Sequence, residues 1–294
     1  MDEASRWRLT LAQRIAQAYA QDPNVDAVAV LGSVSRGCAD RFSDIELGVF
    51  WSEPPSERER EVVVDRVGGT DWRPSPYNEQ IEGWEEEYHL DGVKIDPGHF
   101  VTQTMERLIA DVVDRHDVSL SKQNCVSAIQ RAIPLNGGAV IERWQSKVAS
   151  YPEEVARAMV RQYLSFSPFW MLEMLAERDD FLLVRHNFCA IERQLLLVLM
   201  GLNRIYYPGH KWIHHLIGEL RVAPPDLSRR LKRVLRGDVT IAAKDLRGLI
   251  EETFALVDQH MPEVDTAEAR TRAQQQPHIW EQPPIPMGRG DPPA

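Results

Sequence analysis

The chain of 294 residues has few cysteines and no long apolar segment. Its three cysteines, Cys38, Cys125 and Cys189, lie far apart, so no pair has the spacing of metal ligands. Because their number is odd and small, the sequence does not predict a disulfide framework, and a reducing compartment is favoured. The polar start MDEASRWRLT is not followed by the apolar run of a signal peptide or a membrane span. We therefore expect a soluble cytoplasmic protein that does not insert into membranes.

The sequence also lacks an excess of positive charge. Its 44 acidic and 34 basic residues give a formal net charge of −10. Proteins that bind long nucleic acids through the phosphates usually carry a basic face. This balance leaves room for a local basic patch, but it favours a small or cationic substrate over DNA or RNA. Hydrophobic residues make up 43% of the chain, which is enough for the core of one large or two modest domains.

The first hundred residues alternate between helical and strand-like patterns. Apolar residues spaced by four predict an amphipathic helix over residues 4–21, and a charged stretch predicts a surface helix over 56–67. Asp91-Gly92 separates two strand-like segments and is typical of a hairpin. Residues 70–83 are rich in proline and polar residues and are expected to form a loop. The predicted strands are 25–31, 44–51, 84–90 and 93–96.

After Phe100 the pattern becomes helical. Two long helices are expected between residues 152 and 206, the first of them kinked at Pro168. The end of the chain is rich in Gln, Pro and Gly and is predicted to lack regular structure. The other predicted helices are 101–113, 121–131, 137–149, 225–236 and 241–260. We therefore expect an α+β protein with a mixed sheet and flanking helices over 1–115, an all-α domain over 116–262, and a tail over 263–294.

The segment GSVSRGCADRFSDIE, residues 32–46, contains the elements of a nucleotide site. Gly32 permits a sharp turn and a close approach of the backbone to a ligand. Ser33 adds a hydroxyl beside backbone N–H groups that face an anion, so the pair suits the β- and γ-phosphates of a nucleotide. Asp44 and Glu46 lie two apart on a predicted strand, so their carboxylates share a face. Carboxylates on one face suit Mg²⁺.

A third carboxylate, Asp96, ends the strand-like run VKID. If this strand lies beside the Asp44 strand, three carboxylates meet, and such a set can bind two metal ions. Two ions would escort the triphosphate, lower the pKa of an attacking hydroxyl and stabilise in-line displacement at phosphorus.

This pattern resembles the signature of the DNA polymerase β-type nucleotidyltransferase superfamily. That signature is Gly-Ser, a glycine four residues later, Ser-Asp-hydrophobic-Asp/Glu, and an acidic residue on a later strand. Here it is Gly32, Ser33, Gly37, Ser43, Asp44, Glu46 and Asp96. The resemblance implies that Gly32, Ser33 and Ser43 bind the nucleotide and that Asp44 and Glu46 bind metal. It implies that Asp96 completes the metal site or acts as the base for the acceptor hydroxyl.

The layout of a catalytic sheet followed by a helical domain is similar to that of aminoglycoside- and lincosamide-type nucleotidyltransferases. It is also similar to the minimal nucleotidyltransferases of toxin–antitoxin operons. The segment LNRIYYPGHKWIHHL resembles one in bacterial nucleotidyltransferase proteins of unassigned substrate. Within it, Lys211 is a candidate for a triphosphate contact, and Tyr207 or Trp212 either stacks on a base or packs inside the protein. Arg36 is a further phosphate candidate.

Several acidic and histidine residues near Asp96 have two interpretations. In the run Glu85-Glu86-Glu87, alternate side chains face opposite ways, and they either contact a cationic acceptor or form a solvated face. His89 and His99 either assist proton transfer or are surface or packed residues. Asp44 and Glu46 themselves have a purely structural interpretation, as a turn cap and a solvated strand residue.

The leading hypothesis is a Mg²⁺-dependent enzyme that transfers NMP, with AMP from ATP as the expected case, to a hydroxyl of a small molecule and releases pyrophosphate. One alternative is a toxin–antitoxin-type enzyme that modifies a protein or an RNA 3′ end. Another is a non-catalytic nucleotide-binding protein or a helical-domain ribonuclease. For the ribonuclease, Arg204 and His210 have a matching spacing, but Pro208 and Gly209 break the helix that the motif needs. The acceptor and the oligomeric state stay open.

Overall fold

The computed structural model describes residues 1–178 and 180–277, and its contacts divide the chain into two compact units. The first unit comprises residues 1–160 and 199–221, and the second comprises 161–198 and the chain from 222 onward. This division differs from the predicted boundary at 115–116, because the helices that follow Phe100 cover the sheet and belong to the first unit. Within the described ranges, no helix has both the length and the apolar character needed to cross a membrane.

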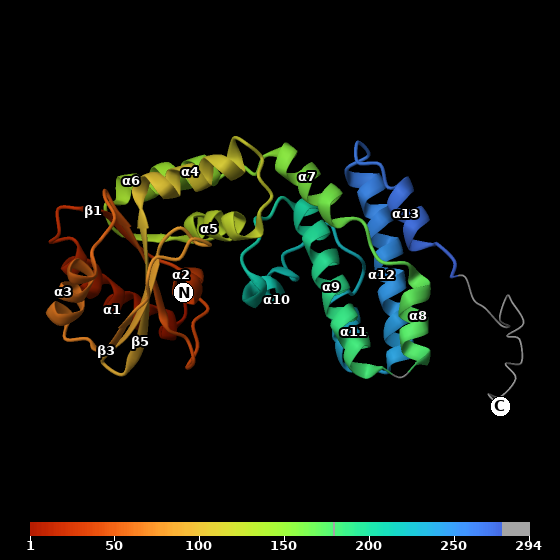
Figure 1. The fold of residues 1–294 in the computed structure, drawn as a ribbon, viewed down its shortest axis with the longest axis horizontal. Helices are drawn as coiled ribbons and strands as arrows, with labels where there is room; N and C mark the ends of the chain where they lie inside the picture. The colour runs from red at the N-terminus through yellow and green to blue at the C-terminus, as the bar shows by residue number, and fades with distance from the viewer. Residues whose placement is uncertain (179, 278–294) are drawn as a thin grey trace, which may run out of the picture. The chain divides into compact units, whose positions relative to one another are not determined.

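The first unit contains a six-stranded mixed sheet in the order β3-β4-β5-β2-β1-β6 (Figure 1). Strands β2 and β5 run parallel, and every other neighbouring pair is antiparallel. The predicted α+β class and the predicted hairpin are confirmed. The strands are β1 (Val25–Val30), β2 (Ile45–Trp51), β3 (Thr70–Pro74), β4 (Trp84–Leu90), β5 (Val93–Val101) and β6 (Ile133–Asn136).

Two strands were not predicted from the sequence, and both lie at an edge of the sheet. β3 falls in the segment expected to be a loop, and it contains Asp71 with a positive φ and Pro74. β6 contains Pro134, which cannot donate a ladder hydrogen bond. Edge strands tolerate proline and polar residues because they pair on one side only, so neither segment carries the usual strand pattern.

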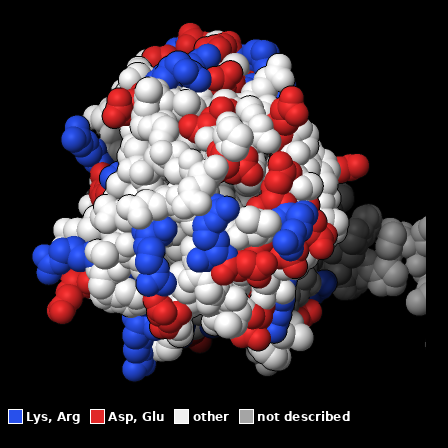
Figure 2. Space-filling view, turned by 90° about the vertical axis from the view of Figure 1, so that its left-hand side faces the viewer, with Lys and Arg blue, Asp and Glu red and all other residues white. Residues whose placement is uncertain are grey.

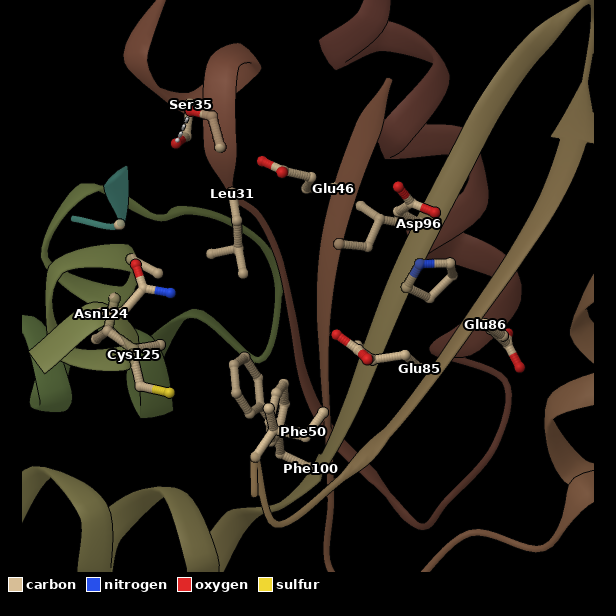
Figure 3. A pocket seen from close by; sticks show the side chains of 18 of the residues that line it. Leu31, Ser35, Glu46, Phe50, Glu85, Glu86, Asp96, Phe100, Asn124 and Cys125 are labelled. Carbon is tan, nitrogen blue, oxygen red and sulfur yellow. Dashed lines mark hydrogen bonds between the residues drawn. The ribbon is translucent and has the colours of Figure 1, made fainter. Parts of the chain in front are cut away.

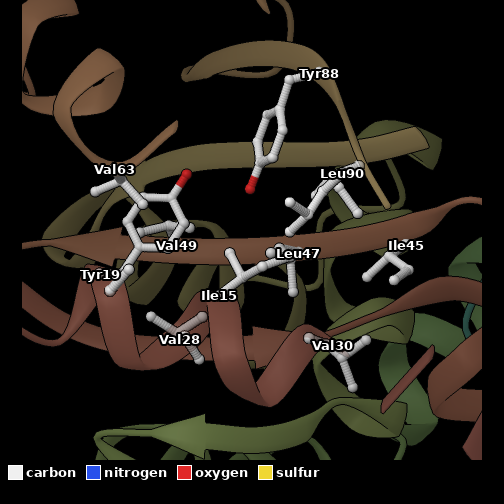
Figure 4. Close-up of a cluster of buried hydrophobic side chains, with 14 of the residues drawn as sticks. Ile15, Tyr19, Val28, Val30, Ile45, Leu47, Val49, Val63, Tyr88 and Leu90 are labelled. Carbon is white, nitrogen blue, oxygen red and sulfur yellow. The ribbon is translucent and has the colours of Figure 1, made fainter. Parts of the chain in front are cut away.

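Helices cover both faces of the sheet. α1 (Glu3–Tyr19) and α3 (Glu57–Val67) lie on one face, and a capping box between Ser56 and Glu59 begins α3. Their apolar residues form one core with alternate strand residues, among them Ile15, Tyr19 and Leu47 (Figure 4). On the opposite face lie α4 (Thr102–Val113), α5 (Leu120–Arg131) and α6 (Gly138–Val148). The short helix α2 (Gly32–Arg36) follows β1 directly.

The segment 199–221 completes the core under α4 to α6. Tyr206 is fully buried there, and its ring lies 4.5 Å from that of Tyr151. The backbone N–H of Tyr207 donates to Oε1 of Gln123 at 3.3 Å. This segment includes the short helices η1 (His210–Trp212) and α10 (Ile213–Leu216). A stretch expected to belong to the helical domain is therefore part of the first unit.

The region from 152 to 206 forms three helices instead of the two expected. α7 (Glu153–Tyr163) ends before Pro168, which is the N-cap of α8 (Phe169–Glu177), and α9 (Phe181–Asn203) follows. Proline disfavours helical backbone in the residue before it, so Pro168 separates two helices instead of kinking one. The second unit also contains α11 (Leu227–Arg236) and α12 (Val239–His260). In its core, the ring of Phe166 contacts that of Phe254 edge-on.

The predicted tail begins too early, because α13 (Ala267–Ala273) forms inside it. Ala273 is fully buried, and Thr266 donates to Asp258 of α12 at 2.7 Å. The guanidinium of Arg270 lies 4.9 Å from the ring centre of Phe254. These contacts dock a segment whose composition alone indicated disorder. Residues 278–294 of the predicted tail lie outside the described residues.

Candidate active site

Gly32 lies where β1 passes into α2, directly against a carboxylate of the neighbouring strand. Its φ is +60°, a backbone conformation that glycine adopts without strain. A Cβ at this position would lie 1.2 Å from Oε2 of Glu46. Glycine is therefore required both by the backbone and by the position of the Glu46 side chain.

The parallel pairing of β2 with β5 brings Glu46 and Asp96 together in the lining of a cavity, with Asp44 next to them. Glu46 is the register partner of Asp96, and Asp44 immediately precedes β2. Burial raises the pKa of Glu46, and the charges of Asp44 and Asp96 raise it further. Burial and a contact with Asp44 likewise raise the pKa of Asp96, although Lys94 acts in the opposite direction. The site thus concentrates negative charge that its surroundings only partly neutralise.

Lys94 occupies one side of this cluster. Its Nζ lies 2.7 Å from Oδ2 of Asp96 and 3.3 Å from Oε2 of Glu87. In the described part of the chain, no three His, Cys, Asp or Glu side chains are already arranged to hold a metal ion. The carboxylates are neighbours that are not arranged around a common point, and Asp96 is paired with Lys94.

The two serines of the motif occupy different surroundings. Ser33 is buried in α2, where its carbonyl accepts from the N–H of Cys38 at 3.1 Å. The Ser43 hydroxyl lies in a turn, accepting from the N–H of Asp40 at 2.9 Å. Ser35 lines the cavity and donates to the carbonyl of Gly32 at 3.1 Å. Ser35 is not among the site residues predicted from the sequence.

The cavity has a volume of about 740 Å³, within the range of small-molecule sites (Figure 3). Gly32, Glu46 and Asp96 line it together with the two predicted phosphate-binding cations, Arg36 and Lys211. The charges of Lys211 and Arg36 both act to lower the pKa of Glu46, so these cations lie within electrostatic range of the carboxylates.

A third cation, Arg131, also lines the cavity and had not been predicted. It is the last residue of α5, and its side chain is half-exposed beside Glu219, 3.7 Å away. Burial lowers the pKa of Arg36, and the charge of Arg131 lowers it further. Two guanidiniums are thus held close enough to repel each other on one wall of the cavity. A basic residue at the end of a helix is common, so no sequence pattern indicates this role.

Two aromatic rings cover part of the sheet side of the cavity. The rings of Phe50 and Phe100 are stacked, with centres 6.2 Å apart. Phe50 covers Gly48, where an added Cβ would lie 2.9 Å from the ring. Phe100 similarly covers Gly83 and Gly98, at 2.8 and 3.0 Å. Because these glycines have no side chain, both rings can pack flat against the sheet, where they form an apolar floor of the cavity.

The three consecutive glutamates of β4 divide as predicted. Glu86 is buried on the face opposite the cavity floor, with Oε2 3.3 Å from Nη1 of Arg60 and Oε1 3.1 Å from Nε2 of His99. The hydroxyl of Tyr19 donates to Oε1 of Glu86 at 3.3 Å. Glu85 is exposed and points into the cavity (Figure 3).

Both histidines near Asp96 follow the structural interpretation. Nδ1 of His99 accepts from the indole N–H of Trp51 at 3.1 Å, which leaves Nε2 to carry the ring proton of a neutral His99. His89 of β4 lies 3.8 Å from Asp71 of the edge strand β3. Neither histidine lines the cavity.

The turn after α9 provides Lys211 but no stacking tyrosine. Tyr207 is 8% exposed, which favours packing over contact with a base. The side chain of Trp212 lies outside the described part of the structure. Arg204 has a positive φ and pairs with Glu153 at 2.8 Å, beyond the end of α9. The helical arrangement of the ribonuclease motif is therefore not formed.

Comparison with known proteins gives two similarities. Residues 118–213 match a family model described as "Domain of unknown function (DUF4037)". The structure is similar to that of a nucleotidyltransferase-like protein from Exiguobacterium sibiricum, with 14% sequence identity and a TM-score of 0.41. That similarity covers 87% of this chain and 79% of the other. No curated protein gives a significant match.

The geometry agrees with the main expectation from the sequence signature. Gly32 follows β1, Glu46 lies on β2, and Asp96 lies on the adjacent parallel strand β5. Of the predicted residues, Gly32, Arg36, Glu46, Asp96 and Lys211 line one cavity. Asp44, Ser33 and Ser43 do not line it, although Asp44 is close to Glu46 and Asp96.

Proposed function

We propose that this protein is a Mg²⁺-dependent nucleotidyltransferase that transfers NMP, with AMP from ATP as the expected case, to a hydroxyl of a small molecule. Pyrophosphate is the second product. The observation that supports this most is the register of β2 and β5, which sets Glu46 beside Asp96 in a cavity that Arg36, Arg131 and Lys211 also line. Carboxylates and cations around one cavity are the groups that a nucleoside triphosphate with bound metal requires.

The donor set suits a hard divalent cation, because Asp44, Glu46 and Asp96 offer only carboxylate oxygen. Burial is the main cause of the raised pKa values of Glu46 and Asp96, and the neighbouring carboxylates add to it; a bound cation would oppose both effects. Mg²⁺ held by these three residues would neutralise the triphosphate and activate the acceptor hydroxyl. For Asp96 to serve as a ligand, Lys94 has to release it.

The proposed reaction is a displacement at the α-phosphorus. The acceptor oxygen bonds to the α-phosphorus as the bond to the bridging oxygen of the β-phosphate breaks, and pyrophosphate leaves. The carboxylate of Asp96 takes the hydroxyl proton in this scheme. Arg36, Lys211 and Arg131 hold the negative charge of the departing phosphates.

A small acceptor is favoured over RNA by the charge of the protein. The face of the first unit in Figure 2 carries acidic and basic side chains interspersed, without a continuous basic surface. The cavity volume also suits a small ligand. Modification of a protein or an RNA 3′ end, as in toxin–antitoxin systems, is the second candidate within the same chemistry.

The test is thermal stabilisation of the full chain by each NTP with Mg²⁺. We expect the wild type to be stabilised by at least one NTP and the double variant Asp44→Ala/Glu46→Ala to lose this response. Glu53→Ala, an exposed residue outside the cavity, is the matched control and keeps the response. Absence of any response in the wild type would contradict the proposal.

A further inference from the structure

Glu85 differs from its two neighbours in β4 by having no partner of its own. Glu86 contacts Arg60 and His99, and Glu87 contacts Arg73 and Lys94 at 2.9 and 3.3 Å. Among the described residues, no side chain forms a hydrogen bond or ion pair with the Glu85 carboxylate. Glu87 lies on the same strand face as Glu85 and also lines the cavity, but it is paired with two cations. Among the described residues, Glu85 is therefore the cavity-lining glutamate of this run that has no cation.

The position of Glu85 relative to Asp96 is fixed by strand pairing. Glu85 is the register partner of Gly98, which lies two residues after Asp96 on the same face of β5. Two residues of a strand span roughly 7 Å. A small molecule lying along β5 can therefore place one group at Asp96 and another at Glu85.

The surface between these two carboxylates is apolar and partly open. Phe100 lies over Gly98, directly beside Glu85, and its ring is only partly buried. Phe50 extends the same floor towards α6, where its ring contacts Trp144 edge-on at 4.8 Å. Figure 3 shows the Glu85 carboxylate and both phenylalanine rings around the same end of the cavity.

We propose that this end of the cavity binds the acceptor and that the acceptor carries a protonated amine on an apolar body. The amine pairs with Glu85 and lies against the face of Phe100, since a cation is attracted by both a carboxylate and an aromatic ring. The apolar body covers Phe50 and Phe100, and the reacting hydroxyl lies at Asp96, two residues along β5 and one strand across from Glu85, a separation of roughly 8 Å. The assignment of the hydroxyl rests on the proposed function, but the cation site does not.

The opposite wall shows why the amine is assigned to this end. Arg36, Arg131 and Lys211 lie together on the side of Gly32 and Ser35, where they disfavour a second cation. Arg73 also lines the cavity, but it pairs with Glu87 across the β3–β4 ladder. The three cations near Gly32 therefore suit phosphates, and Glu85 with the two aromatic rings suits the acceptor amine.

The test compares two probes of nearly equal shape, 2-phenylethylamine and 2-phenylethanol, bound to the full chain at pH 7 by isothermal titration. We expect the wild type to bind the amine roughly 10-fold more tightly than the alcohol. Glu85→Gln should remove this preference without changing the affinity for the alcohol. Glu53→Gln, the exposed control away from the cavity, should keep it.

Equal affinity of the wild type for the two probes would overturn the proposal, and so would a preference that survives Glu85→Gln. NTP-induced stabilisation, measured on the same proteins, separates this result from the proposed function. If the wild type prefers the amine but responds to no NTP, the nucleotidyltransferase proposal fails and the cation site stands. If NTPs stabilise the wild type and the Glu85→Gln variant while neither discriminates between the probes, the acceptor class alone is wrong.

Discussion

Gly32 is constrained by its backbone angle and, separately, by the carboxylate beside it, and a second glycine separates the two effects. Gly68 has a φ of +78° with nothing within 4 Å of an added Cβ, whereas a Cβ on Gly32 overlaps Glu46. We expect Gly68→Ala to cost about 1 kcal/mol of unfolding free energy from the left-handed backbone alone. Gly32→Ala should cost roughly 1–3 kcal/mol more, because Glu46 has to move.

Chemical denaturation of both variants measures this difference, and NTP-induced stabilisation reports the consequence for the site. Gly32→Ala should lose the NTP response, while Gly68→Ala keeps it. Equal destabilisation of the two variants would mean that the Glu46 side chain moves away from Gly32 without cost. The Glu46 carboxylate would then not be packed tightly against Gly32.

Arg131 is expected to bind the terminal phosphates of the nucleotide. It faces Arg36 on the cavity wall, and a bridging anion would relieve the repulsion between the two guanidiniums. We expect Arg131→Gln to weaken binding of NTP and of pyrophosphate roughly 10-fold while NMP binding changes little. Titration calorimetry with the mono-, di- and triphosphate of one nucleoside measures this dependence on phosphate number.

The control for Arg131 is Arg143→Gln, which removes an exposed arginine that pairs with Glu106 outside the cavity. It should leave all three affinities unchanged. A uniform loss across the mono-, di- and triphosphate in Arg131→Gln would instead assign Arg131 to the base or the sugar.

The contrast between Glu46 and Arg131 shows which site residues a sequence can reveal. Gly32, Asp44 and Glu46 lie in one short segment, so their spacing alone predicts a shared face. Asp96 required one further assumption, that its strand lies beside β2, and the register confirms this. Arg131 and Phe100 reach the cavity only through tertiary packing, and neither belongs to a local pattern.

A buried polar network joins five elements of the first unit. Glu86 of β4 contacts Arg60 of α3, His99 of β5 and Tyr19 of α1, and His99 in turn accepts from Trp51 of β2. Burial alone would raise the pKa of Glu86, but the contact with His99 and the charge of Arg60 lower it below its usual value. The network therefore keeps a charged carboxylate inside the protein.

Removal of Arg60 should be costly because it leaves the charge of Glu86 without its main cation. We expect Arg60→Met to lower the unfolding free energy by about 3–5 kcal/mol. The double variant Arg60→Met/Glu86→Gln should be more stable than Arg60→Met, since the uncompensated charge is gone. Arg58→Met, which breaks an exposed pair with Glu61, should cost no more than about 1 kcal/mol.

Urea denaturation of these variants gives the coupling between Arg60 and Glu86. If Arg60→Met and Arg58→Met are equally stable, the buried pair contributes no more than a surface pair, and another contact has to hold α3 on the sheet.

The elements that the sequence predicted share a strong periodic pattern, and those it missed do not. α1 and β2 each have a continuous apolar face, and both were located within a few residues. β3 and β6 are stabilised by pairing with one neighbour, and that pairing depends on residues distant in sequence. A kinked helix was expected at Pro168, but the chain forms two separate helices there, because Pro168 is the N-cap of α8.

The division of the whole chain was harder to predict than its elements. Residues 161–198 belong to the second unit, but residues 199–221 belong again to the first unit, and Lys211 among them lines the cavity. Composition changes near Phe100, but α4, α5 and α6 complete the first unit by covering a face of its sheet. A boundary based on local composition cannot reveal such a return.

The charge of the whole molecule leads to a prediction about where the transferred nucleotide goes. With a net charge of −10, the protein should repel polyanions, because binding to RNA depends on neutralising phosphates. With NTP labelled at the α-phosphate and a cell extract as the source of acceptors, we expect the label in the small-molecule fraction. Acid precipitation separates this fraction from labelled RNA and protein.

Asp44→Ala/Glu46→Ala should transfer no label, which identifies the activity as that of this site. Label in the precipitate that nuclease removes would establish an RNA acceptor, and label that protease removes would establish a protein acceptor. Either result would replace the small-molecule assignment, because the interspersed charges in Figure 2 would then not govern acceptor choice.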